Sequence, residues 1–232
     1  MKAQFSQKMQ GSRRAVMEAI AAITHTRVIY SGAPSFAYNT GDWHIDREGV
    51  LTSPVFSTEG GGPLFHADLM GTIGTQGIAA EGLLTVTIFP EDFDPSHLTN
   101  IRGMLAGKAT LLRHALGVEV DPDACLAAGD VLERYGLPGG FVFPCFAAAT
   151  TFAGILAPLQ MAERIHAQAA AQLRVRARDM AVVNEKYAMR CFLLRIGMIG
   201  RDYAVARKEL LRRLPGNSSF KSGRPSDNSP NE

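Results

Sequence analysis

The sequence predicts an α+β fold in which a small antiparallel sheet with flanking helices is followed by a helical C-terminal region and a disordered tail. Three patterns predict it: a helical apolar stripe over 13–24, short alternating segments over 27–52 and 83–89, and a helical pattern from 147 almost to the end. The chain has 232 residues, of which 46% are apolar. That is enough to bury a sizeable core, and it excludes an intrinsically disordered protein.

We expect residues 1–52 to form an N-terminal helix and an antiparallel meander. Ser12 is a good N-cap for a helix over Arg13–Thr24, because its hydroxyl can accept a hydrogen bond from the first helical turn. The next segments alternate in polarity between turns rich in Gly, Ser and Asn, and they predict strands at 27–30, 36–38, 42–46 and 50–52. The first ten residues lack the apolar stretch and cleavage site of a secretory signal, so we expect a cytoplasmic protein.

Residues 53–82 contain clustered and regularly spaced glycines and show little periodicity. Such a long irregular segment inside a compact domain is typical of a mobile linker or a functional loop. We therefore expect a Gly-rich linker or loop that separates the meander from the rest of the chain.

Residues 83–146 predict a strand–helix–strand region. Leu83–Phe89 alternates like a strand, and a capping residue followed by proline begins a single helix that runs from Asp94 to Leu116. Gly103 and Gly107 each cost such a helix about 1 kcal/mol, so we expect another segment of backbone to pack closely against them. The remaining predictions are an edge strand at 118–120, a short helix at 123–135 and a strand at 141–143.

The last third of the chain predicts a helical region over 147–215 and a disordered tail over 216–232, which is rich in Ser, Pro, Asn and Gly. We expect helix breaks at Pro158, near 179–183 and at 197–200, and a final helix over 201–214.

The uncharged run 141–162 is long enough to cross a bilayer. Its two prolines, its polar residues and its many alanines favour instead a buried strand followed by a buried helix. We therefore expect no interaction with a membrane.

Charge is shared unevenly along the chain. Residues 1–160 carry 10 basic and 15 acidic side chains, whereas residues 161–232 carry 14 basic and 7 acidic ones. This excess of positive charge favours an anionic partner for the C-terminal region, although a solvated helix face shows the same pattern. A helix would place Arg201, Lys208 and Arg212 on one stripe, within reach of one phosphate backbone. The candidate residues for contact with nucleic acid or another anion are Arg190, Arg195, Arg201, Lys208, Arg212 and Lys221.

A second, weaker candidate site is the polar face of a predicted strand. Asp42, His44 and Asp46 alternate with apolar residues, and two carboxylates and an imidazole on one face can hold a metal or carry out acid–base chemistry. Any half-buried strand shows this alternation, and no second cluster is spaced to complete a metal site, so we expect no cofactor. The three cysteines match no zinc-binding spacing and are expected to be small core residues.

Three segments resemble a known family. They are YSGAPSFAY at 30–38 with Gly41 and Ile45-Asp46, KATLL at 108–112 with ALG at 115–117, and NEKYAMRCFLLRIGMIG at 184–200 with GNSSFK at 216–221. In this order they resemble the "virulence-related" proteins of conjugative transposons and similar mobile elements of Gram-positive bacteria. Residues 53–82 match nothing in that family. Residues 143–146 read Phe-Pro-Cys-Phe where the family tends to read Phe-Pro-Trp-Phe, so we expect different packing there.

The resemblance implies a cytoplasmic accessory protein of a mobile genetic element, in a family with no established activity and no assigned site residues. Together with the charge distribution, it predicts a non-enzymatic interaction module whose partner is nucleic acid or another mobile-element protein. The alternative is an enzyme, or the partner of an enzyme, with a site near Asp42, His44 and Asp46 and the Gly-rich loop.

Overall fold

The computed structural model describes residues 1–128, 137–178 and 182–219 and confirms the α+β class. Its strands are β1 (Lys2–Met9), β2 (Val28–Tyr30), β3 (Tyr38–Thr40), β4 (Trp43–Ile45), β5 (Val50–Thr52), β6 (Phe56–Ser57), β7 (Ala80–Phe89), β8 (Leu126–Ala128) and β9 (Gly140–Ala147). The helices are α1 (Arg13–Thr24), α2 (Gly62–Thr75), α3 (His97–Ala106), α4 (Ala109–Leu116), α5 (Phe152–Ala170), α6 (Glu185–Arg195) and α7 (Ala204–Leu211), with a 3-10 turn at Pro122–Ala124.

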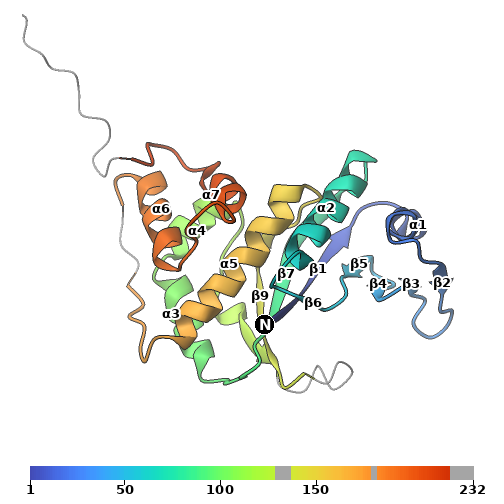
Figure 1. Ribbon diagram of the computed structural model, residues 1–232, viewed down its shortest axis with the longest axis horizontal. Coiled ribbons are helices and arrows are strands. Elements are labelled where there is room, and N and C mark those ends of the chain that lie inside the picture. The colour runs from blue at the N-terminus through green and yellow to red at the C-terminus, as the bar shows by residue number, and fades with distance from the viewer. Residues whose placement is uncertain (129–136, 179–181, 220–232) are drawn as a thin grey trace, which may run out of the picture.

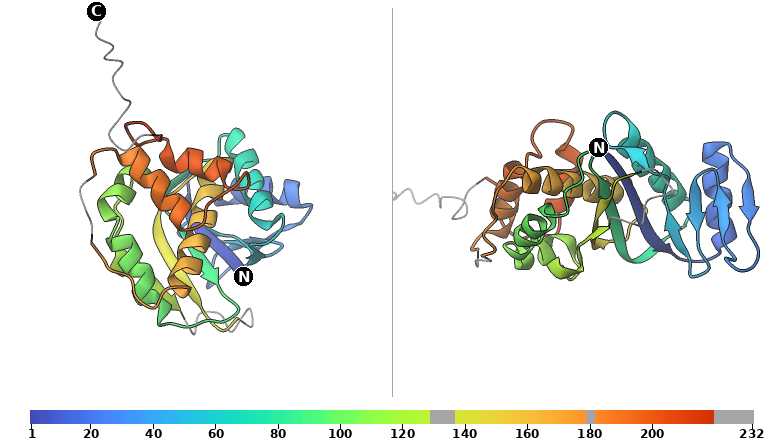
Figure 2. Two further views of the ribbon diagram at one scale, coloured as in Figure 1. Left: turned by 60° about the vertical axis from the view of Figure 1, so that its left-hand side comes forward. Right: turned by 90° about the horizontal axis from the view of Figure 1, so that it is seen from below.

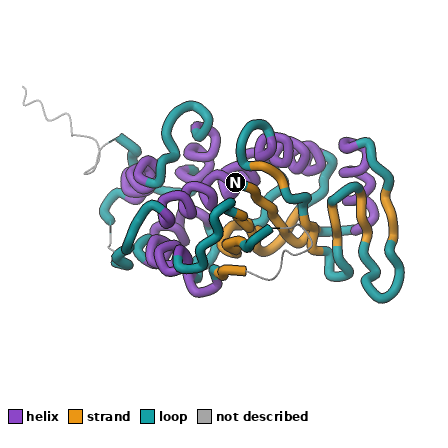
Figure 3. The backbone as a smooth tube through the Cα atoms, turned by 60° about the horizontal axis from the view of Figure 1, so that its bottom comes forward, coloured by secondary structure: helices purple, strands orange, loops and turns teal. Residues whose placement is uncertain are grey.

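One antiparallel sheet connects the strands of the described residues, in the order β2-β3-β4-β5-β1-β7-β9-β8, with β6 also paired to β1. The meander β2–β5 with α1 lies at one end of the molecule, and α3, α4, α6 and α7 lie at the other (Figure 1, Figure 3). Helices α2 and α5 lie across the same face of β1, β7 and β9, where they cover the core (Figures 1 and 2).

The N-terminal segment is a central strand, which the sequence analysis did not predict. In β1 the alternate residues Ala3, Phe5, Gln7 and Met9 are buried, and the strand pairs with β5, β6 and β7. Only two of the eight residues are large and apolar, so the alternation is weak in sequence. The strand is stabilised by its neighbours, because it pairs with β5 of the meander on one side and with the long strand β7 on the other.

The first helix and the meander are confirmed with small shifts. Ser12 caps α1 by accepting a hydrogen bond from the Ala15 N–H, as expected. The second strand of the meander begins at Tyr38 rather than Phe36, because residues 32–36 form a turn in which Phe36 has a positive φ of 50°.

The expectation of a linker or loop over 53–82 is wrong. Residues 62–75 form α2, which buries apolar side chains of its own (Leu69, Met70 and Ile73). The glycines serve close packing: a Cβ on Gly71 would lie 3.2 Å from the Phe152 nitrogen, and one on Gly74 would overlap the Thr150 carbonyl oxygen. Helix α2 therefore packs directly on the start of α5, and the boundary predicted here lies inside one core.

The single helix predicted from Asp94 to Leu116 is in fact two helices, α3 and α4, which meet at Gly107 and Lys108. The change of direction lets α3 pack on α5 while α4 packs on α6 and α7. The close approach expected at the glycines is confirmed, since Cβ atoms on Gly103 and Gly107 would lie 3.2 Å from Val175 Cγ1 and 3.4 Å from the Arg178 nitrogen.

The edge strand predicted at 118–120 is absent, and the strand at 141–143 is confirmed within the longer β9. The helix predicted at 123–135 is also wrong where the structure describes it: residues 122–124 form the 3-10 turn and 126–128 form β8, which pairs with β9. Its remaining part, 129–135, lies outside the described residues.

Helix α5 runs through Pro158 without ending, contrary to the expected break. Proline removes one hydrogen bond to the Gly154 carbonyl, but α5 packs against α2, α3, α7, β7 and β9, and this packing holds the helix together. No helix in the described ranges combines the length and the hydropathy that a bilayer crossing requires.

The break at 197–200 is confirmed, and no helix is found over the described residues of 171–184, where 179–181 lie outside the description. The last helix is shorter than predicted, 204–211 rather than 201–214. Residues 216–219, predicted as the start of a disordered tail, are placed against α6, where Asn184 Nδ2 donates to the Asn217 carbonyl at 2.8 Å. The rest of that tail, 220–232, lies outside the described residues.

Candidate nucleic-acid interface

The basic C-terminal surface is built by two helices that bury one face each. Asn184 caps α6 by accepting from the Tyr187 N–H, and α6 buries Met189, Phe192 and Leu193. Helix α7 buries Ala206 and Leu210. The charged residues between these positions therefore lie on the outer faces of both helices.

Three basic side chains from the two helices line one groove. Lys186 of α6 and Lys208 and Arg212 at the end of α7 line a space of about 670 Å³. Its other lining residues are Ala153, Val205, Glu209, Leu211 and Ser218. Arg190 lies beside this set, since its Nη1 donates to the Ser218 carbonyl oxygen at 3.5 Å. We call the surface formed by Lys186, Arg190, Lys208 and Arg212 the basic groove.

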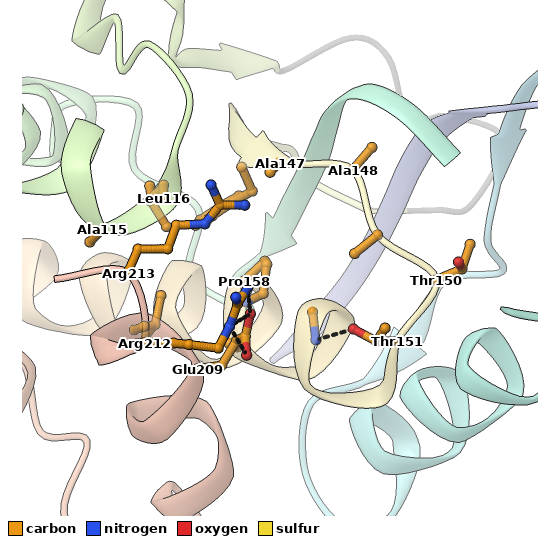
Figure 4. Close-up of a pocket in the computed structure, with 15 residues that line it drawn as sticks. Ala115, Leu116, Ala147, Ala148, Thr150, Thr151, Pro158, Glu209, Arg212 and Arg213 are labelled. Atoms are coloured by element: carbon orange, nitrogen blue, oxygen red, sulfur yellow. Dashed lines mark hydrogen bonds and ion pairs between the residues drawn. The ribbon is translucent and has the colours of Figure 1, made fainter. Parts of the chain in front are cut away.

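A smaller pocket of about 280 Å³ (Figure 4) shares Glu209 and Arg212 with the lining of the basic groove. Arg212 and Arg213 extend into it from the end of α7, opposite Thr150 and Thr151 at the start of α5 (Figure 4). The Thr151 hydroxyl caps α5 by accepting from the Gly154 N–H at 3.1 Å. Positive charge therefore continues from the groove toward a helix N-terminus, whose partial positive charge has the same sign.

An acidic residue moderates this charge. Glu209 accepts two short hydrogen bonds from Arg212, at 2.9 Å from Nη2 and 3.0 Å from Nε, and this pairing raises the pKa of Arg212. Glu209 is three residues before Arg212 on the same helix, so the pair is local. The Arg212 side chain is 59% exposed and that of Glu209 is 26% exposed, so the pair removes part of the field of Arg212 without burying the guanidinium.

The other predicted residues divide into three groups. Arg195 is exposed at the end of α6, and Arg201 is exposed in the turn before α7, where it lines a different cavity with Glu163 and Asp202. Lys221 lies outside the described residues. The predicted stripe of Arg201, Lys208 and Arg212 is thus divided, because α7 begins after Arg201.

Within the described residues, no acidic side chain from the front part of the chain forms an ion pair with this surface. Among the ion pairs of the described residues, only Arg212–Glu209 involves any of Arg190, Arg195, Arg201, Lys208 and Arg212. The charge asymmetry of the sequence therefore persists on the folded surface.

Two residues of this surface were missed by the sequence analysis. Lys186 joins Lys208 only because α6 packs beside α7, and Arg213 reaches the small pocket because its guanidinium lies over Gly117, where any Cβ would collide with it. The excess of basic residues after residue 161 indicated a positively charged surface, but it could not show which helix faces pack together and so which basic side chains meet.

The structure does not assemble the alternative site at Asp42, His44 and Asp46. Trp43 and Ile45 face the core, so His44 lies on the opposite face of β4, where its Nδ1 is 2.8 Å from Asn39 Oδ1. Asp42 is exposed in a turn, and Asp46 Oδ1 accepts from the Val50 N–H in the next turn. Across the described part of the chain, no group of three His, Cys, Asp or Glu side chains could hold a metal ion.

Cys125 and Cys145 are small core residues, as expected, and they also meet one another. The thiols of Cys125 and Cys145, both buried, share a hydrogen bond that lowers the pKa of Cys125 and, with burial, raises the pKa of Cys145. Cys191 is half-buried. None of the three cysteines lines the basic groove.

No protein-family model matches this chain, and no curated protein matches it.

Proposed function

We propose that this chain is a non-enzymatic accessory protein of a mobile genetic element and that it acts in the cytoplasm by binding nucleic acid through the basic groove. The observation that carries the proposal is the convergence of Lys186, Lys208 and Arg212, from two helices, on one groove. The family resemblance supports the accessory role, and the uneven charge of the two parts of the chain supports an anionic partner.

A double helix fits this surface better than a single strand. Single-stranded nucleic acid is usually bound by exposed aromatic rings on which bases stack. The aromatic residues closest in sequence to the groove, Tyr187 and Tyr203, are only half-exposed, and Phe192 is buried. Lysine and arginine contacts to phosphates hold a protein on a duplex without reading its base sequence.

The test is duplex binding by wild type and by a charge-reversed variant, measured by fluorescence anisotropy over a range of salt. We expect Lys186→Glu/Lys208→Glu/Arg212→Glu to abolish binding, and the milder triple glutamine variant to make the slope of log K against log salt less negative by up to about 3. The control Lys2→Glu/Arg27→Glu/Arg47→Glu makes the same change in net charge at exposed sites in the front part of the chain, and it should keep at least most of the affinity.

Retention of wild-type affinity and salt slope by the triple glutamate variant, with an unchanged circular dichroism spectrum, would refute the proposal. Equal losses in both triple variants would also refute it, because net charge rather than the groove would then govern binding. If the wild type binds no duplex but binds an acidic protein of the same element through the same three residues, the partner is a protein and the nucleic-acid assignment is wrong.

A further inference from the structure

A second cavity, which shares only Val205 with the lining of the basic groove, lies between the start of α2, the first half of α5 and the turn before α7. Its volume is about 570 Å³. Leu64 of α2 and Phe152 and Leu156 of α5 form an apolar wall, and Leu64 is 49% exposed. An exposed leucine on the wall of a concave site offers unfilled apolar surface to a ligand.

The polar end of the cavity holds an acceptor that lacks a donor. Gln160 Nε2 donates to the Asp202 carbonyl at 3.2 Å, which fixes the orientation of the amide. Gln160 Oε1 is then buried, and no described residue donates to it. Leaving a buried acceptor unpaired costs about 1–3 kcal/mol, so a donor from a ligand would be favoured there.

Glu163 lies one helical turn after Gln160 and lines the same cavity. Burial raises the pKa of this carboxyl, and the Arg164 guanidinium and the Thr58 hydroxyl offset part of that effect. The Met1 ammonium also acts electrostatically on Glu163, but no basic group of the described residues lies within ion-pair distance of it, and the Arg164 guanidinium donates to the Ile196 carbonyl. A cationic donor would therefore be paired here by both an amide oxygen and a carboxylate.

Arg201 brings the opposite charge to this cavity. It is exposed, and it forms no ion pair with any residue that the structure describes. A guanidinium is suited to bidentate hydrogen bonds with a carboxylate. The cavity thus offers two acceptors, a carboxylate-binding group and an apolar wall.

We propose that this cavity binds a free α-amino acid with an aliphatic or aromatic side chain. Its ammonium group donates to Gln160 Oε1 and Glu163, its carboxylate accepts from Arg201, and its side chain packs on Leu64, Phe152 and Leu156. This site does not depend on the basic groove, and it adds a small-molecule ligand to a protein whose proposed partner is nucleic acid.

The test is isothermal titration calorimetry of the full chain with L-leucine and L-phenylalanine. Two analogues of leucine dissect the contacts: L-leucinamide lacks the carboxylate, and 4-methylpentanoate lacks the ammonium. We expect at least one of the two amino acids to bind, and each leucine analogue to bind at least about tenfold more weakly than leucine if leucine binds, or to show no binding.

Variants assign each contact. Glu163→Gln should weaken amino-acid binding about tenfold or more and leave any 4-methylpentanoate binding unchanged. Arg201→Gln should also weaken amino-acid binding about tenfold or more, but it should leave any leucinamide binding unchanged. Arg195→Gln, an exposed arginine that does not line the cavity, is the control and should bind like wild type.

The proposal is overturned if neither amino acid binds the folded wild type, or if both cavity variants bind as wild type does. Leucinamide binding as tight as leucine would overturn the assignment of the carboxylate to Arg201, and with it the amino-acid class. Because the triple glutamate variant of the basic groove retains all of Glu163, Gln160 and Arg201, it should still bind the amino acid even if it loses nucleic acid.

Discussion

Gln7 and Ala149 exchange two hydrogen bonds: Gln7 Nε2 donates to the Ala149 carbonyl at 2.8 Å, and the Ala149 N–H donates to Gln7 Oε1 at 3.0 Å. Gln7 is a buried residue of the central strand β1, and Ala149 lies in the turn that leads into α5. One side chain thus satisfies both backbone groups of a residue 142 positions away. It fixes the turn that forms one wall of the pocket beside Arg212 and Arg213.

Replacing Gln7 by leucine should destabilise the protein by about 2–4 kcal/mol, because the N–H and carbonyl of Ala149 would both lose their partner. Urea unfolding followed by circular dichroism measures the change. Gln10→Leu is the matched control: Gln10 is exposed, its side chain makes one long hydrogen bond of 3.5 Å, and the expected change is below about 0.5 kcal/mol. Equal effects of the two substitutions would contradict the role given to Gln7.

Gly74→Ala should cost about 1–3 kcal/mol, because the added methyl group would overlap the Thr150 carbonyl and separate α2 from the start of α5. Gly61→Ala is the control, since a Cβ there has no atom within 4 Å and φ is an ordinary −85°. Thermal unfolding of both variants checks the prediction. A Gly74→Ala protein as stable as wild type would mean that the two helices are not in contact at this glycine.

We expect the buried His166 to lower the free energy of unfolding as the pH becomes acidic. Its ring is buried beside Phe141 and the ring of His97, at 5.0 and 5.9 Å between centroids, and neither of its nitrogens has a hydrogen-bond partner among the described residues. Burial, with a smaller contribution from His97, lowers the pKa of His166 to about 4. The Asp94 carboxylate lies 3.7 Å from His97 Nε2.

The direction of the effect follows from the two states. As the pH falls, the imidazole of the unfolded chain, with a pKa of about 6.5, binds its proton before that of the folded protein. The contribution of His166 to the free energy of unfolding is therefore fully present above pH 6.5. It falls by about 3 kcal/mol in total between pH 6.5 and about 4. His166→Leu should remove this part of the pH dependence of the free energy of unfolding, and His25→Asn, at an exposed position, should retain it. A variant curve parallel to that of wild type would disprove the assignment to His166.

Glu209→Gln should strengthen duplex binding by about three- to tenfold at low ionic strength, because the neutral amide no longer competes for the Arg212 guanidinium. The comparison is Glu18→Gln, which breaks a similar local pair with Arg14 at 2.8 Å on α1, far from the groove along the molecule (Figure 1). Anisotropy at several salt concentrations measures both. Unchanged or weaker binding by Glu209→Gln would argue that Arg212 does not contact the partner.

Local patterns predicted the parts of the fold that local interactions determine. Ser12 caps α1 as its residue type indicates, Gly117 ends α4 with a φ of 71°, and the short alternating segments form the meander. These features depend on hydrogen bonds and turns within a few residues, so one sequence is enough to identify them.

The errors arose where packing overrides local preference. Glycines in 62–75 indicate flexibility in isolation, yet in α2 they are contact points for α5. Pro158 indicates a break, yet α5 is supported on several sides and continues. Strand β1 has few apolar residues, and its partners β5 and β7 are distant in the chain.

The sequence by itself determined the α+β class, the first helix and meander, and a positive charge excess after residue 161. Only the tertiary structure decided that Lys186 joins Lys208 and Arg212 in one groove and that Arg201 lines another cavity. It also decided that Asp42, His44 and Asp46 form no metal-binding group within the described residues. The physical reason is that composition and periodicity fix charge and local conformation. Which side chains meet depends on helix packing and strand order, and these are set by contacts between residues far apart in the chain.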